Sequence, residues 1–215
     1  MLVLASTSPR RRVLLDRSGW EYRLASPVAV DESIFPGESP RKYVVRLAQE
    51  KARACLNLAR PGELILGADT TVVHRGEILG KPADAGEAIA MLERLRGEVH
   101  QVFTALALIR AGEPVNILTD LCVTDVTMRA YSTVEMNAYV ASGDPFDKAG
   151  GYAIQHAGFD PVERIDGCYA NVVGLPLCHL ARLLCEWGFP LAVDLPNTCK
   201  NALDYECALS QMVLN

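Results

Sequence analysis

The sequence lacks several patterns that would place it in a well-defined functional class. No stretch of about 18 apolar residues occurs, so no membrane-spanning helix is expected. The apolar run at the N-terminus is short and has no basic segment before it, which predicts a first strand and not a signal peptide. A P-loop, a GxGxxG after a strand and a GxSxG are all missing, and the histidines show no HExxH or zinc-ligand spacing. These absences exclude the commonest signatures of phosphate, dinucleotide, ester and zinc chemistry.

Paired cysteines are missing as well. The chain has seven cysteines, an odd number, and no CxxC motif. This usage indicates free thiols in a reducing compartment and argues against a disulfide framework or a zinc site, so we expect a cytoplasmic protein. The net charge of −5 argues against a surface dedicated to nucleic acid or to an anionic membrane. A negative net charge is still compatible with a local cluster of basic residues that binds a small anion.

Start and stop signals for helices and strands alternate along the chain. Strands are predicted at 1–5, 63–73, 78–79, 99–109 and 115–128, and helices at 9–18, 40–58, 84–97, 132–143 and 176–187. Short strands are expected within 147–173. A turn at Gly112-Glu113-Pro114 joins two long strands and implies a mixed sheet, so the predicted class is α/β. Residues 1–189 are expected to form one domain, and 190–215, which loses its periodicity, a tail of unknown role.

The first candidate site is the segment 6–12, STSPRRR, at the junction of the first strand and helix. Ser8 is placed to cap the helix, and Pro9 suits the first helical position. Backbone N–H groups and the helix dipole favour anions at such a junction, whereas three arginines oppose the dipole. The segment is therefore either a phosphate site with arginine forks or a capped helix with a solvated basic turn.

Three charged residues interrupt patterns that are otherwise apolar or structural. Lys51 lies on the core-facing stripe of a helix, where it either snorkels to the edge or reaches a buried anion. Asp69 lies within the apolar strand LILGADTTVV and is costly there unless it is paired or bound to metal. A structural aspartate at a bulge near Gly67 is the alternative. Lys81 follows one hairpin later, either close to Asp69 or as a solvated loop lysine.

The last candidate segment is 147–155, DKAGGYAIQ. Its paired glycines precede an expected strand and let a ligand approach the backbone. Gln155 has both a donor and an acceptor, which suits recognition of a base edge. A plain turn followed by a strand explains the same pattern.

Six motifs in collinear order resemble the Maf family of nucleoside triphosphate pyrophosphatases over about residues 1–189. They are Ser6 to Arg11, Glu50-Lys51-Ala52, Gly67-Ala68-Asp69-Thr70, Gly80-Lys81-Pro82, Asp147-Lys148-Ala149-Gly150 and Val173-Gly174-Leu175-Pro176-Leu177. The resemblance implies a central mixed twisted sheet flanked by helices, with two lobes and a cleft, as in inosine triphosphate pyrophosphatases. It also implies hydrolysis of the α–β phosphoanhydride to a monophosphate and pyrophosphate, and a homodimer.

Within the family, Thr70 and the segment 151–155 resemble the branch acting on dTTP and UTP. The resemblance implies that Arg11, Thr70 and Gln155 set base specificity. The chain departs from the family at His156, where glycine is usual, and in the stretch 157–161. Both departures bear on the fine substrate preference more than on the chemistry.

The remaining roles implied by the resemblance concern the phosphates, the metal and water. Ser8, Arg10, Lys51 and Lys81 would bind phosphate, and Arg11 would contribute to the same charge balance. Glu32 and Asp69 would hold a divalent cation, Mg²⁺ or Mn²⁺, with Asp69 also the proton acceptor. The sequence leaves open whether Asp31 or Glu32 faces the site. Alternatives to this function are a nucleotide-binding regulator of septum formation with little turnover, a 7-methyl-GTP pyrophosphatase and an inosine triphosphate pyrophosphatase.

Overall fold

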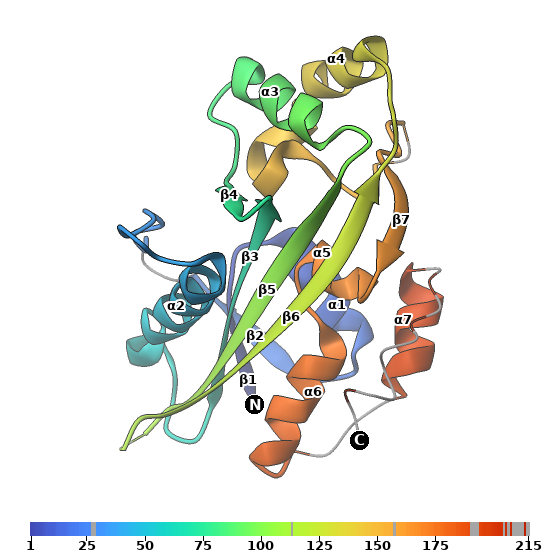
Figure 1. The fold of residues 1–215 in the computed structure, drawn as a ribbon. Coiled ribbons are helices and arrows are strands. Elements are labelled where there is room, and N and C mark those ends of the chain that lie inside the picture. The colour runs from blue at the N-terminus through green and yellow to red at the C-terminus, as the bar shows by residue number, and fades with distance from the viewer. Residues whose placement is uncertain are drawn as a thin grey trace.

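A mixed sheet forms the centre of the molecule (Figure 1). The computed structural model describes residues 1–26, 29–112, 114–156, 158–189, 194–203, 205, 207 and 213. Within these residues the sheet has seven strands in the order β2-β1-β3-β5-β6-β7, with β4 paired to β3. They are β1 (Leu2–Ala5), β2 (Tyr22–Ala25), β3 (Leu64–His74), β4 (Glu77–Leu79), β5 (Val99–Arg110), β6 (Asn116–Met128) and β7 (Val162–Asp166).

Both pairing modes occur in the sheet, as predicted. Strand β1 is parallel to β2 and β3, whereas the pairs β3–β4, β3–β5, β5–β6 and β6–β7 are antiparallel. The long hairpins inferred from the sequence are therefore present. Of the predicted turn at 112–114, Glu113 lies outside the described residues. Among the described residues no helix combines the length and apolar character needed to cross a membrane.

The helices cover the two faces of the sheet unequally. They are α1 (Pro9–Arg17), α2 (Pro40–Arg53), α3 (Ala85–Leu95), α4 (Thr133–Ala141), α5 (Tyr169–Val173), α6 (Leu177–Glu186) and α7 (Leu195–Leu203). Helix α2 covers one face, where it packs on β3 and β5. The opposite face carries α1, α5 and α6 at one end and α3 and α4 at the other (Figure 1).

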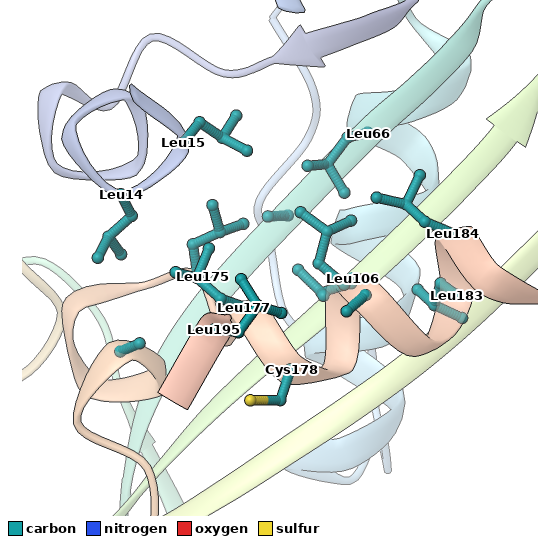
Figure 2. Packing of buried hydrophobic residues seen from close by; sticks show 14 of the residues in the cluster. Leu14, Leu15, Leu66, Leu106, Leu175, Leu177, Cys178, Leu183, Leu184 and Leu195 are labelled. Carbon is teal, nitrogen blue, oxygen red and sulfur yellow. The ribbon is translucent and has the colours of Figure 1, made fainter. Parts of the chain in front are cut away.

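The core follows from the two-residue alternation of β3. Ile65 and Val73 face α2, whereas Leu64 and Leu66 pack with α1 and α6 in the cluster shown in Figure 2. Farther along the same strand, Val72 belongs to a separate cluster with α3 and α4. The face opposite α2 therefore carries two apolar lobes, and the residues of β3 between them lie at a cleft.

Four details differ from the sequence expectations. Strand β2 was not predicted; it is four residues long and lies at the sheet edge. Helix α2 ends at Arg53, and a 3-10 turn, Leu56–Leu58, follows and leaves Leu58 half exposed. The strand expected after the paired glycines is absent; a 3-10 turn at Ala149–Gly151 is followed by a turn at 154–155. Residues 169–173 form α5 and not a strand.

The chain after Phe189 contributes to the core. Residues 190–193 and most of 204–215 lie outside the described part of the chain. Helix α7 places Leu195 and Cys199 in the same buried cluster as α1 and α6, and Leu195 is labelled there in Figure 2. The division into a domain of residues 1–189 and a tail of 190–215 stays a prediction.

Candidate active site

Strand β3 presents its polar residues to both faces of the sheet. Gly67 and Asp69 are two residues apart and face α2, whereas Thr70 faces the opposite side. A Cβ atom at Gly67 would collide with the backbone oxygen of Ala48 and would lie 2.7 Å from the backbone nitrogen of Ala52. The absence of that Cβ lets α2 approach β3 closely. The close approach positions the turn of α2 between Ala48 and Ala52 beside Asp69.

Lys51 comes from that turn and joins two carboxylates. Its Nζ lies 2.6 Å from Oδ1 of Asp69 and 2.7 Å from Oε1 of Glu32. We name Glu32, Lys51 and Asp69 the carboxylate–lysine cluster. The Nζ of Lys81 lies 3.8 Å from Oε2 of Glu32, so Lys81 meets the cluster through Glu32. Of the two alternatives for Lys51, the structure places it on a buried anion.

The orientation of Glu32 follows from its neighbours. The hydroxyl of Tyr43 donates to the backbone oxygen of Glu32 at 3.0 Å. The preceding Asp31 uses its own Oδ1 to accept from the backbone N–H of Ser33 at 2.9 Å and is exposed. Glu32 is therefore the member of the acidic pair that faces the cleft.

The two carboxylates of the cluster have opposite pKa shifts. Burial raises the pKa of Asp69 despite the charges of Lys51 and Arg11. Burial also opposes ionisation of Glu32, but the hydrogen bond and charge of Lys51, with Lys81 beyond it, lower the pKa of that half-exposed carboxyl. Burial thus disfavours the ionised form of Asp69, whereas the neighbouring lysines favour the ionised form of Glu32.

The donor set of the cluster suits a hard divalent cation. Both carboxylates offer oxygen ligands at the cleft, and no group of three or more His, Cys, Asp or Glu side chains arranged to hold a metal occurs in the described part of the chain. Mg²⁺ takes one or two protein carboxylates and completes its octahedron with water and substrate phosphate. The residues therefore fit Mg²⁺ or Mn²⁺ and not a closed structural zinc site.

On the opposite face of β3, Arg11 is fixed by three hydrogen bonds. Its Nε donates to the backbone oxygen of Gly174 at 2.8 Å, Nη1 to Oγ of Ser6 at 3.2 Å and Nη2 to Oγ1 of Thr70 at 3.1 Å. Burial lowers the pKa of Arg11, and the charge of Asp69 opposes that effect. The guanidinium is held against the cleft wall with a defined orientation.

Behind Thr70 lies a chain of buried hydroxyl and backbone groups. Oγ1 of Thr70 lies 2.9 Å from Oγ1 of Thr104, which donates to the backbone oxygen of Asn171 at 2.9 Å. Thr104 lies opposite Thr70 in the β3–β5 register. The amide of Asn171 donates in turn to the backbone oxygen of Val102 and to Oγ1 of Thr124, which anchors α5 to the sheet.

The N-terminal segment and the glycine-rich segment close the cleft from two sides. Ser8 occupies the N-cap position of α1, as predicted, but its side chain makes no capping hydrogen bond. Nη1 of Arg10 lies 3.2 Å from Oδ2 of Asp147, across the cleft wall. Oδ1 of the same aspartate lies 2.6 Å from Nζ of Lys148. The first turn of α1 and the cations Arg10 and Lys148 thus line one space.

That space is a cavity of about 420 Å³. Every site residue expected from the sequence lines it: Ser8, Arg10, Arg11, Glu32, Lys51, Asp69, Thr70, Lys81 and Gln155. Gln155 lies exposed in a turn and not on the expected strand. Its hydrogen bond to the Tyr169 hydroxyl opposes the burial-driven rise in that tyrosine's pKa. Lys81 lines the same cavity as Asp69, and its ion pair is with Glu32.

Several lining or supporting residues were missed by sequence reasoning. Lys148 is nearly buried, with Nζ bonded to the backbone oxygen of Asp144 at 2.6 Å, although it looks like an ordinary turn residue. Ser6 and Gly174 act through Arg11. For Thr104 a signal existed, because it is the polar residue within the apolar run VFTALALI.

Sequence comparisons with known proteins point to one family. A family model described as Maf-like protein matches residues 1–187. A dTTP/UTP pyrophosphatase from Anaeromyxobacter dehalogenans is 47% identical over 196 residues, covering 91% of this chain and 98% of that protein. Another from Thermomicrobium roseum is 47% identical over 204 residues, covering 93% and 91%. A solved nucleoside-triphosphatase / dITP/XTP pyrophosphatase from Mycobacterium abscessus aligns with a TM-score of 0.39 and 15% identity over 86% of this chain and 96% of that one.

Proposed function

Because the chain belongs to the Maf family, we propose that it hydrolyses dTTP and UTP to the nucleoside monophosphate and pyrophosphate. The observation that carries the proposal is the carboxylate–lysine cluster, in which a buried aspartate of raised pKa lies beside a cavity lined with cations. A protein that only binds nucleotides has no use for a water-activating carboxylate. The names of the relatives supply the pyrimidine nucleotides as the substrates to test first.

The triphosphate requires positive charge, and the cavity supplies it from two sides. Arg10 and Ser8 lie at the start of α1, and Lys51 and Lys81 lie on the side of Glu32. In our proposal these four bind the phosphate oxygens, Ser8 through its neutral hydroxyl and the other three as cations. Cations preorganised around developing negative charge are usually the main catalytic contribution. Lys51 also counteracts the effect of burial on Asp69, because its charge and hydrogen bond favour the ionised carboxylate.

Asp69 is the proposed proton acceptor. Its Oδ1 is held by Lys51, so Oδ2 is the oxygen we assign to the attacking water. As the water oxygen bonds to phosphorus, Asp69 takes the water proton, the α–β bridging P–O bond breaks and pyrophosphate leaves with its electron pair. A divalent cation held by Glu32 and Asp69 would supply charge neutralisation and lower the pKa of bound water. Mg²⁺ and Mn²⁺ are the cations that we propose for this site.

The opposite face of β3 is the proposed base site. Arg11 and Thr70 line the cavity with a fixed hydrogen-bond arrangement, and Gln155 lies at its rim. A uracil or thymine edge presents hydrogen-bond acceptors and one imide donor, which such groups can read. We further propose a homodimer located in the cytoplasm, with no nucleic acid among its partners.

Pyrophosphate release from a panel of nucleoside triphosphates tests the function. We expect dTTP and UTP to be cleaved fastest in Mg²⁺ or Mn²⁺, with release of pyrophosphate and not of orthophosphate, and turnover to stop in excess EDTA. Preference for ITP and XTP would instead indicate an inosine triphosphate pyrophosphatase, and preference for 7-methyl-GTP would indicate a 7-methyl-GTP pyrophosphatase. Binding of UTP without any pyrophosphate release would contradict the enzyme and favour a regulator.

A further inference from the structure

The direction in which the Thr70 hydroxyl donates its hydrogen bond follows from counting the hydrogens of the two neighbouring threonines. A threonine hydroxyl has one hydrogen to donate and two lone pairs to accept with. The single hydrogen of Thr104 goes to the backbone oxygen of Asn171, which as a carbonyl only accepts. Thr104 therefore has no hydrogen left for Thr70, so the 2.9 Å contact between the two hydroxyls is donated by Thr70.

The same counting fixes what Thr70 offers to a ligand. Nη2 of Arg11 donates to Oγ1 of Thr70, which uses one of its two lone pairs. The hydrogen of Thr70 is committed to Thr104, away from the cavity. The remaining lone pair is the only group with which the Thr70 hydroxyl can meet a base. At this position the site accepts a hydrogen bond and does not donate one.

Arg11 supplies the complementary group. Three of its five N–H hydrogens bond to Gly174, Ser6 and Thr70 within the described residues, which leaves one on Nη1 and one on Nη2. Arg11 and Thr70 thus present donors next to an acceptor. Uracil and thymine carry an imide N3–H beside a C4 carbonyl oxygen, which is the matching pattern. Cytosine carries an acceptor at N3 and an amino donor at C4, which reverses it.

We propose that Thr104 is a positioning residue that sets the hydrogen-bond polarity of Thr70, so that the site selects uracil and thymine over cytosine. The inference rests on the proposed function and deepens it. Thr104 itself cannot touch the base, because it is fully buried behind Thr70. Its acceptor, Asn171, is also fully buried and is tied to β5 and β6 by its amide, so the direction of the chain is built into the fold.

The test is the ratio of kcat/KM for UTP to that for CTP. Thr104→Val keeps the shape of the side chain but removes the acceptor of the Thr70 hydrogen, which then becomes free to donate to N3 of cytosine. We expect the ratio to fall about tenfold, with the value for CTP rising in absolute terms. Thr104→Ser retains the hydroxyl and should retain the ratio.

Thr124→Val is the matched control. Thr124 is also a fully buried strand threonine, and it bonds the amide of Asn171 and the backbone of Cys168, but it has no contact with Thr70. Its loss should reduce stability and leave the ratio unchanged, because the Asn171 amide keeps its hydrogen bond to the backbone oxygen of Val102. An unchanged ratio in folded Thr104→Val, or an equal change in Thr124→Val, would overturn the proposal. Thr104→Ala replaces Thr104→Val should the latter not fold.

Binding of non-hydrolysable nucleotides tests the role of Thr104 independently of whether the chain hydrolyses UTP. The α,β-methylene analogues of UTP and CTP lack the cleavable bond, and calorimetry gives their affinities directly. A wild-type preference for the UTP analogue that falls about tenfold in Thr104→Val supports the role of Thr104 even where the chain shows no turnover. Equal affinities of the wild type for both analogues would contradict it, whatever the hydrolytic activity.

Discussion

Asp69 and Thr70 are adjacent in the sequence, yet they belong to two chemically different regions on opposite faces of β3. On the face that α2 covers, three charged groups meet at salt-bridge distance around Lys51. On the other face, hydrogen bonds run in one direction from the part-buried Arg11 through the hydroxyls of Thr70 and Thr104 to the backbone oxygen of Asn171. Two consecutive residues of β3 thus belong to different regions. Asp69 lies among charged groups, and Thr70 lies in a chain of directed hydrogen bonds.

In the proposed function, this difference lets one strand support both reaction and recognition. The charged face must tolerate phosphate and a metal, and its members Glu32 and Lys81 are about half exposed to solvent. The neutral face must distinguish bases that differ by one donor and one acceptor, which requires buried groups that cannot reorient, such as Thr104. Substitutions on the two faces should therefore change different measurable quantities.

The largest effect is expected on the charged face. Asp69→Asn removes the proposed proton acceptor while retaining the shape of the side chain and an oxygen for Lys51. We expect kcat for UTP to fall about 1,000-fold, within the range that general-base catalysis contributes. The relative affinities for the α,β-methylene analogues of UTP and CTP should stay as in the wild type. Turnover above one tenth of wild type would contradict the role of Asp69, and a changed affinity ratio would contradict the separation of the two faces.

Gly67→Ala is expected to have a smaller effect, also confined to the charged face. The new Cβ would meet the backbone of Ala48 and Ala52, so α2 must move away from β3 and carry Lys51 with it. Overpacking of this kind costs about 1–3 kcal/mol, and we expect kcat to fall about tenfold with an unchanged UTP-to-CTP ratio. Urea unfolding and steady-state kinetics measure the two effects.

Gly80→Ala is the control for Gly67→Ala. A Cβ at Gly80 meets no atom within 4 Å, so the same substitution should leave both stability and kcat near wild type. If Gly67→Ala behaved like Gly80→Ala, the close approach of α2 would not be what holds Lys51 over Asp69.

Local patterns predicted most of this arrangement. Capping signals gave α3 and α4, since Asp84 and Ser132 both accept the expected backbone hydrogen bonds. Asp69 and Lys51 were identified because each breaks an apolar pattern, and the structure pairs them. The family resemblance was needed to add Glu32, whose loop has no periodicity to interpret.

What the sequence could not give depends on distant contacts. Strand β2 is too short for a clear pattern and is stabilised by parallel pairing with β1. Thr104 and Asn171 are 67 positions apart and become one hydrogen-bonded unit only when α5 folds back on β5. Residues 195–199 joined the core by packing on helices that lie far from them in sequence. Such partners follow from tertiary folding and not from local preference.

The smallest expected effect is the pH dependence of stability, and it too should differ between the faces. Burial raises the folded-state pKa of Asp69 above its unfolded value, so folding favours the protonated form. This contribution is fully present below the unfolded pKa of about 3.9 and is lost as pH rises through the folded pKa. The free energy of unfolding of the wild type, measured relative to Asp69→Asn, should therefore decrease as pH rises from about 4 toward neutrality.

Thr70→Val on the other face removes no titrating group. The difference between its free energy of unfolding and that of the wild type should therefore stay constant over the same pH range. Urea titrations of the three proteins at matched pH values give both differences, and a wild type that gains on Asp69→Asn as pH rises would mean that the attraction of Lys51 outweighs the burial of the carboxylate.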